Sequence, residues 1–147
     1  MELIHWLTNK FLKGKYPYPV CDAIIKFYEN GKFNGVVLVE RKNPPFGWAL
    51  PGGFAEYGES LEDCVKRECL EETGLKVKIL RQLHTYSDPK RDPRVHTVST
   101  VFLCRASGKF RGGSDAKNVK VVSVKEALNL KLCFDHSKIL KDAKRFL

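Results

Sequence analysis

Short apolar runs separated by turn residues divide the chain into strand-like and helix-like segments. The runs over 21–28 and 35–41 flank Asn30-Gly31, a dipeptide typical of a tight hairpin, so we expect two antiparallel strands there. Apolar residues that alternate with polar ones, or that form short blocks, predict the other strands over 48–54, 77–86, 96–105 and 119–124. Helical spacing predicts helices over 60–73, 125–130 and 136–146, with a polar loop over 108–118.

The order of these elements indicates one domain with a mixed sheet. Strands come first, then a helix, then strands, and finally two helices, which favours a sheet with helices packed on it. The length of 147 residues is that of a single domain, so we place one domain over residues 1–147. Residues 1–15 are short and mixed in character, and they could form a helix.

The helix predicted over 60–73 carries acidic residues where a core helix would be apolar. Ser60 suits its N-cap and Gly74 its end. On a helical wheel Glu68 and Glu72 lie in the sector beside the apolar edge, and Glu71 is close to both. Like charges on adjacent turns repel, and a hard divalent cation would compensate them. The alternative is a solvated acidic face paired with lysine and arginine of the same helix.

Charge and cysteine usage narrow the class of protein. There are 26 Lys and Arg against 17 Asp and Glu, a net charge of +9, which indicates an anionic partner: nucleotide, nucleic acid or anionic membrane. No apolar run is long enough for a membrane span. The five cysteines form no C-x-x-C pair, so we expect buried, reduced thiols and a cytoplasmic protein. His84, His96 and His136 are isolated and predict no zinc site.

The segment over 53–75 resembles the Nudix box, G-x5-E-x7-R-E-U-x-E-E-x-G-U, in which U is a bulky aliphatic residue. It begins at Gly53, carries Glu59, and continues with Arg67-Glu68-Cys69-Leu70-Glu71-Glu72-Thr73-Gly74-Leu75. The small apolar Cys69 at a U position is the departure. By this resemblance we expect the Nudix fold of the α/β (α+β) class: an α/β/α sandwich around a mixed sheet, with the box as a loop–helix–loop.

The resemblance also implies the reaction and the roles of residues. Nudix hydrolases cleave nucleoside diphosphate derivatives with Mg²⁺ or Mn²⁺, and the metal ligands implied here are Gly52, by its carbonyl, Glu68, Glu71 and Glu72. Arg67 would orient the carboxylates, and Glu59 would be structural or a peripheral metal contact. The glycines at 52 and 53 would let the backbone approach the phosphates without a Cβ. The general base is either Asp115, or Glu71 or Glu72 acting on a metal-bound water.

Three further segments resemble the ADP-ribose pyrophosphatase branch: residues 47–54, residues 87–96 with Pro89, and Phe134-Asp135-His136. They imply hydrolysis of ADP-ribose to AMP and ribose 5-phosphate. Arg91 and Arg94 would bind phosphate, or else pair with Asp88 and Asp92. Trp48, with Phe46, would stack on a base or lie in the core.

Other functions stay open beside this one. One is a nucleotide-sanitising or dinucleoside polyphosphate hydrolase. From a different class comes a non-catalytic nucleotide- or RNA-binding module, suggested by the net charge. The sequence shows no basic patch with interleaved aromatics, so we do not expect a nucleic-acid partner. The branch often forms homodimers, and Trp6, Phe11 and Leu12 could pack across such an interface.

Overall fold

The computed structural model describes residues 16–113 and 116–147. The helix and the dimer contacts predicted within residues 1–15 lie outside this part of the chain, as does Asp115. In the described residues, every helix is too short or too polar to cross a membrane.

Within the described ranges, seven strands form one mixed sheet. They are β1 (Tyr18–Glu29), β2 (Lys32–Arg41), β3 (Trp48–Ala49), β4 (Gly52–Phe54), β5 (Lys78–Tyr86), β6 (Thr97–Ser107) and β7 (Ala116–Val122). The sheet runs in the order β3-β2-β1-β6-β5, with β4 on β1 and β7 on β2. The central pair, β1 and β6, is parallel, and the other pairs are antiparallel. The predicted hairpin at Asn30-Gly31 joins β1 to β2.

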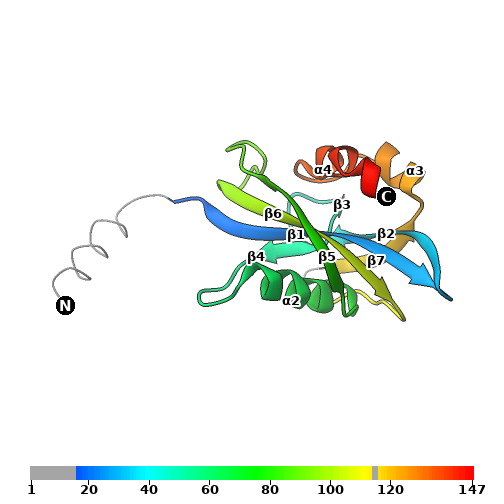
Figure 1. Ribbon diagram of the computed structural model, residues 1–147. Helices are drawn as coiled ribbons and strands as arrows, with labels where there is room; N and C mark the ends of the chain where they lie inside the picture. The colour runs from blue at the N-terminus through cyan, green and yellow to red at the C-terminus, as the bar shows by residue number, and fades with distance from the viewer. Residues whose placement is uncertain (1–15, 114–115) are drawn as a thin grey trace.

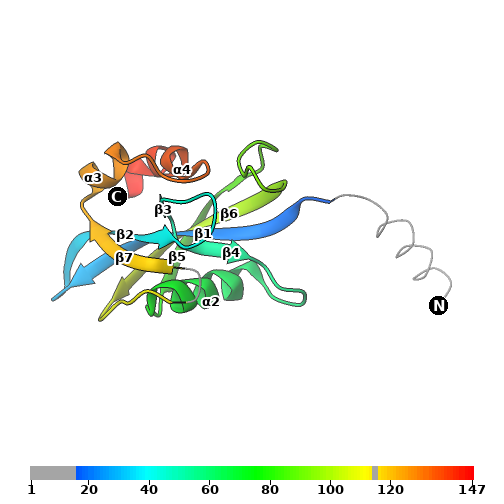
Figure 2. The same ribbon diagram turned by 180° about the vertical axis from the view of Figure 1, so that it is seen from behind.

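Helices cover both faces of the sheet. Figures 1 and 2 show α2 (Leu61–Thr73) on one side, and α3 (Val124–Asn129) with α4 (His136–Asp142) on the other. A short 3₁₀ helix, η1 (Lys144–Phe146), follows α4. The predicted caps of α2 are present: Ser60 Oγ accepts the Asp63 N–H at 3.1 Å, and Gly74 has a left-handed φ of 73°. The predicted α/β/α sandwich is confirmed.

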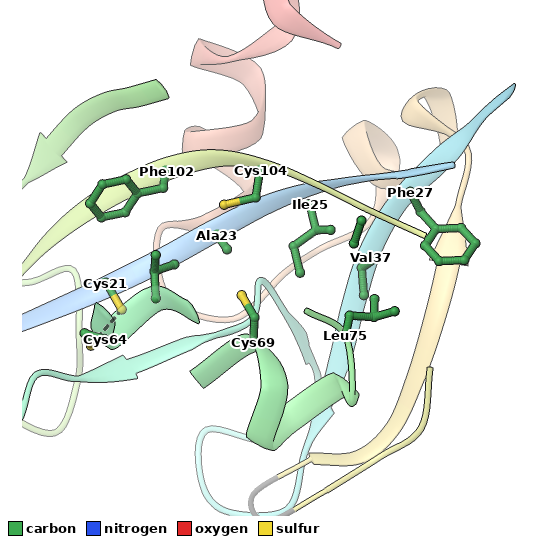
Figure 3. Packing of buried hydrophobic residues seen from close by; sticks show 12 residues of the cluster. Cys21, Ala23, Ile25, Phe27, Val37, Cys64, Cys69, Leu75, Phe102 and Cys104 are labelled. Carbon is green, nitrogen blue, oxygen red and sulfur yellow. Dashed lines mark hydrogen bonds between the residues drawn. The ribbon is translucent and has the colours of Figure 1, made fainter. Parts of the chain in front are cut away.

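Alternation along β1 builds a core on each side of the sheet. Cys21, Ala23, Ile25 and Phe27 face α2, whereas Ile24 belongs to the cluster beneath α3 and α4. Figure 3 shows the first cluster, which contains four fully buried thiols: Cys21, Cys64, Cys69 and Cys104. All five cysteines are free and Cys133 is half-buried, so the prediction of buried, unpaired thiols holds for four of them.

Three sequence-based boundaries were wrong. The single strand predicted over 48–54 is two strands, because Pro51 has no N–H for a ladder and the chain turns there from β2 to β1. The Pro51 carbonyl still accepts the Ala23 N–H at 2.8 Å. The last predicted helix breaks at Ala143 into α4 and η1. The loop predicted over 108–118 gives way to β7, which begins at Ala116.

Candidate active site

One arginine on α2 holds the carboxylates of the predicted motif. The guanidinium of Arg67 donates to Glu59 at 2.7 and 2.9 Å, to Glu68 at 2.8 Å and to Glu71 at 3.3 Å. It also donates to the Phe54 carbonyl at 3.1 Å, which ties the helix to β4. The Arg67 charge lowers the pKa of Glu59 to about 2, chiefly through their hydrogen bonds. The repulsion expected on this helix is therefore compensated largely from within the motif.

Glu72 is the buried carboxylate of the helix. It is 6% exposed, and its Oε2 accepts the Gly52 N–H at 2.9 Å. Burial raises the pKa of Glu72 to about 8, and the negative charges of Glu68 and Asp22 add to this effect. The hydrogen bond from Gly52 opposes it only in part. Glu72 therefore sits where a cation would stabilise its charged form.

The two glycines before and at the start of the motif are needed for close packing. A Cβ on Gly52 would overlap the Cys21 carbonyl and crowd the Asp22 side chain. A Cβ on Gly53 would overlap the carboxylate of Glu68. Only glycine lets β4 pass between β1 and α2 at this distance. The structure thus places the Gly52–Gly53 backbone directly beside both principal carboxylates.

The donor set suits a hard divalent cation. Among residues 16–113 and 116–147, no group of three or more His, Cys, Asp and Glu side chains forms a ready-made metal site. Mg²⁺ does not require one, because it typically uses one or two carboxylates together with waters and substrate phosphates. Glu68 and Glu72 supply oxygen donors, and because burial beside Glu68 and Asp22 raises the pKa of Glu72, a cation there would stabilise its charged form. The residues present fit Mg²⁺ or Mn²⁺.

A cavity of about 340 Å³ opens beside these carboxylates. Glu68, Glu72, Gly52 and Gly53 line one part of it, together with Arg67. The other lining residues include the basic and aromatic side chains Arg41, Arg91, Arg94, Phe54 and Phe134. The cavity thus joins a region rich in carboxylates to a region rich in guanidinium groups and rings.

Arg41 and Phe134 are cavity residues to which sequence reasoning gave no role. The guanidiniums of Arg41 and Arg94 lie 4.9 and 5.1 Å from the centroid of the Phe134 ring. Arg41 donates to the Pro45 carbonyl at 2.9 Å, and it forms no salt bridge with any described residue. Phe134 has a left-handed φ of 56°, a conformation that a bulky residue rarely adopts and that clusters at functional sites. Only the motif Phe134-Asp135-His136 pointed here from sequence.

The two arginines predicted to bind phosphate lie in different surroundings. Arg94 is 38% exposed and is paired with Asp92 at 2.8 and 3.0 Å, as its structural alternative predicted. Arg91 is buried and pairs with neither Asp88 nor Asp92. It donates to Asp135 at 2.8 and 3.0 Å, and its Nη2 lies 3.4 Å from Asp22 Oδ2. Its donors are largely used by the protein itself, which favours a positioning role.

Asp22 and His136 extend this network to the turn before Gly52. The Leu50 N–H donates to His136 Nδ1 at 2.9 Å, so the ring proton is on Nε2, which lies 3.4 Å from Asp22 Oδ1. Ser99 also donates to Asp22. Burial acts to raise the pKa of Asp22, but His136, Ser99 and Arg91 together lower it below its usual value. A lone aspartate inside the apolar run at 20–25 was the available sequence signal for this buried site.

Trp48 and Phe46, the two aromatic residues predicted to stack on a base, lie outside the cavity. Trp48 packs against the core beneath α3 and α4, and Lys120 Nζ lies 4.1 Å from its ring centroid. Neither aromatic is among the described residues that line the cavity. The alternative that places Trp48 at the core agrees with this geometry, and Phe54 and Phe134 are the rings in the cavity.

Comparison with known proteins agrees with this site. A family model of the NUDIX domain matches residues 17–143. An ADP-ribose pyrophosphatase of Methanocaldococcus jannaschii is 44% identical over 142 residues, which are 94% of this chain and 79% of that protein. The ADPR responsive transcriptional repressor NtrR of Acinetobacter baylyi is 32% identical, over 91% of this chain and 56% of the repressor.

Solved structures give the same result. The NUDIX domain of Shewanella oneidensis NrtR, complexed with ADP ribose, superposes with a TM-score of 0.82 at 27% identity, covering 99% of this chain and 98% of that chain. A MutT/nudix family protein from Enterococcus faecalis has a TM-score of 0.77 at 32% identity, and the match covers 98% of this chain and 68% of that chain. The motif, the fold and these relatives together show that the chain belongs to the NUDIX family and is a Nudix hydrolase.

Proposed function

We propose that the protein hydrolyses ADP-ribose to AMP and ribose 5-phosphate, with Mg²⁺ as its cofactor and Mn²⁺ as a possible substitute. The observation that carries the proposal is that carboxylates and guanidinium groups line one and the same cavity. A diphosphate needs a metal to neutralise its charge, and its two sugar arms need polar and aromatic contacts. The 44% identical ADP-ribose pyrophosphatase and the ADP-ribose complex of the NrtR domain support this substrate.

The carboxylates of α2 form the metal side of the site. Glu68 and Glu72 would be the main ligands, with Glu71 and the Gly52 carbonyl as further donors. A divalent ion held there would supply charge neutralisation for the diphosphate and would lower the pKa of a bound water. Arg67 holds Glu68 and Glu71 in place through its planar fork. The proton of the attacking water goes to a carboxylate, either Asp115 or one of Glu71 and Glu72.

The guanidinium side of the cavity would bind the substrate. Arg41 and Arg94 would take the phosphate or ribose oxygens that the metal leaves free, because both line the cavity and neither is fully buried. Phe134, held between the two cations, would fix their orientation and offer an apolar edge to the substrate. Arg91 would act through Asp22 and Asp135 rather than by contact.

Substrate choice tests the proposal. We expect kcat/KM for ADP-ribose to exceed the values for NADH and diadenosine tetraphosphate by at least about tenfold, or roughly 1.4 kcal/mol of transition-state binding. The measurement is release of AMP at matched Mg²⁺ and pH. A preference for diadenosine tetraphosphate or for a damaged nucleoside triphosphate would overturn the substrate assignment and leave the Nudix hydrolase standing.

A second candidate is recognition of ADP-ribose without turnover. The 32% identity to an ADPR responsive repressor favours it. The complete set of Glu68, Glu71, Glu72 and Arg67 argues for catalysis, since binding alone has no need of clustered like charges. Calorimetry beside the AMP assay separates the two, because a sensor binds ADP-ribose and leaves it intact.

Location and assembly complete the proposal. Free thiols suit a cytoplasmic protein. We expect a homodimer that uses Trp6, Phe11 and Leu12, and a monomeric mass by sedimentation would exclude it.

A further inference from the structure

A row of three cations crosses the sheet at the end near the β1–β2 hairpin. Lys26 of β1 is in register with Arg105 of β6, and Arg105 is in register with Lys78 of β5. Residues in register on neighbouring strands present their side chains on the same face. Like charges directly opposite one another destabilise a sheet. None of the three forms a salt bridge within the described ranges, so the charge of the row is uncompensated there.

Aromatic rings lie among these cations. The Arg105 guanidinium is 4.5 Å from the ring centroid of Tyr28, and Lys26 Nζ is 5.0 Å from that of Phe33. Tyr28 and Phe33 also contact each other, with centroids 5.7 Å apart. Phe33 is 40% exposed. The hairpin therefore presents rings and cations together.

The C-terminal 3₁₀ helix η1 adds further cations and a ring to this group of residues. Lys26 Nζ donates to the Phe146 carbonyl at 2.9 Å. The guanidiniums of Arg81 and Arg145 lie 4.8 and 4.7 Å from the Phe146 ring centroid. Both are exposed, neither has a salt bridge in the described chain, and they line a hollow of about 300 Å³ with Phe146. We call these eight residues the basic-aromatic surface: Lys26, Tyr28, Phe33, Lys78, Arg81, Arg105, Arg145 and Phe146.

The basic-aromatic surface is separate from the catalytic cavity. None of its residues lines that cavity. Lys26 alternates with Ile25 and Phe27 of the cluster under α2, so it lies on the opposite face of the sheet, where Phe146 packs against the second cluster. Figures 1 and 2 show α3, α4 and the C-terminus on that face and α2 on the other. The net charge of +9 is thus concentrated in part where hydrolysis does not use it.

We propose that the basic-aromatic surface binds single-stranded nucleic acid. Cations that follow a phosphate backbone, with rings on which bases stack, are the two parts of such sites. A second copy of this chain fits poorly, because a two-fold contact would bring the same cations face to face. An anionic membrane or an acidic protein would satisfy the charges but would give the rings no planar partner.

The sequence did not reveal this surface because its residues come from separate segments. The hairpin supplies Lys26, Tyr28 and Phe33, two other strands supply Lys78, Arg81 and Arg105, and the C-terminus supplies Arg145 and Phe146. The expectation of no nucleic-acid partner rested on the absence of a visible patch. In the folded chain these separate segments form such a patch, so the present proposal replaces the expectation of no nucleic-acid partner.

Fluorescence anisotropy of labelled oligothymidylate and oligouridylate tests the proposal. The full chain is titrated in EDTA, which keeps metal-dependent hydrolysis out of the measurement, at salt concentrations of about 50 to 200 mM. With three to five phosphates neutralised, the slope of log Kobs against log salt should lie between about −2 and −3.5. Lys78→Glu/Arg105→Glu should weaken binding at least tenfold.

Two further variants make the result specific. Lys66→Glu/Lys90→Glu changes the net charge equally but lies on α2 and in the loop before β6, so it should weaken binding less than threefold. Phe33→Ala should weaken binding about fivefold or more without altering the salt slope, because it removes stacking and no charge. The Lys78/Arg105 variant should keep the thermal midpoint and the ADP-ribose activity of the parent.

Each other outcome overturns the proposal. Equal loss in the two charge-reversed variants would mean non-specific attraction by a basic protein. Binding to vesicles rich in phosphatidylserine, without binding to either oligonucleotide, would assign the surface to a membrane. Binding to neither would leave it without this function. None of these results depends on which nucleotide the enzyme hydrolyses.

Discussion

Arg67 and Arg91 both gather carboxylates at the same cavity, but they do so in different ways. Arg67 is about one quarter exposed and holds acids that are close in sequence, Glu59, Glu68 and Glu71. Arg91 is 3% exposed and joins Asp22 to Asp135, which are far apart in the chain. The first network positions groups for metal binding, whereas the second fixes β1, the loop before β6 and the start of α4 around Gly52. Removing each arginine should therefore affect different quantities.

The largest effect should follow from Arg91→Met. Loss of the buried cation leaves Asp135 without its ion-pair partner and leaves Asp22 with only Ser99 and His136. Breaking a buried ion pair in this way typically costs about 3–5 kcal/mol in the free energy of unfolding. Urea denaturation measures it, with Lys90→Met as the control at an exposed neighbour, expected within about 0.5 kcal/mol of the parent. A loss below about 1 kcal/mol for Arg91→Met would show that the network is not a structural tie.

Glu72→Gln should reduce turnover rather than stability. We expect kcat to fall on the order of 10²-fold or more, comparable with the loss of a principal electrostatic stabiliser. The free energy of unfolding should hold or rise, because the raised pKa means that folding must protonate Glu72 or bury its charge, and glutamine requires neither. AMP release at saturating Mg²⁺ gives kcat, and Glu62→Gln on the exposed first turn of α2 is the control. Near-normal activity in the Glu72 variant would remove it from the metal site.

Arg67→Lys should separate geometry from charge. Lysine keeps the positive charge but lacks the planar fork that reaches several acceptors at once. We expect the Mg²⁺ concentration for half-maximal activity to rise severalfold, with a stability loss of no more than about 1 kcal/mol because the pairs are partly exposed. An unchanged Mg²⁺ dependence would show that Arg67 does not orient the ligands.

The smallest effect should come from Asp92, which pairs with the exposed Arg94. Burial acts to raise the pKa of Asp92, but the hydrogen bonds and charge of Arg94 lower it below the usual value. The lowered pKa stabilises the fold above the pKa of an unfolded aspartate, and this contribution is lost as the pH falls through the folded value. The parent should therefore lose more of its free energy of unfolding on acidification than Asp92→Asn does, by at most about 1 kcal/mol. Identical pH–stability curves for variant and parent would show that the pair contributes nothing.

The same contrast explains what could be predicted from sequence. The Arg67 network lies within one motif, so helical spacing placed Glu68, Glu71 and Glu72 together and the resemblance to the Nudix box implied that Arg67 orients them. The pairing of Arg67 with Glu59 came from the structure alone. The Arg91 network depends on which strands are neighbours. Nothing in the local sequence near Arg91 distinguishes Asp135 from Asp88 or Asp92 as its partner. The placement of Arg41 beside Phe134 depends likewise on sheet order. The break in the strand predicted over 48–54 falls at Pro51, which the sequence does show, but the partners of its two halves depend on sheet order.

The most direct test of the central claim is the identity of the products from ADP-ribose. The protein is mixed with ADP-ribose and Mg²⁺, and the mixture is resolved by chromatography with mass detection. The account predicts AMP and ribose 5-phosphate in equal amounts, both abolished by EDTA and both strongly reduced in Glu72→Gln. ADP-ribose that binds in calorimetry but stays intact with Mg²⁺ or Mn²⁺ would contradict it.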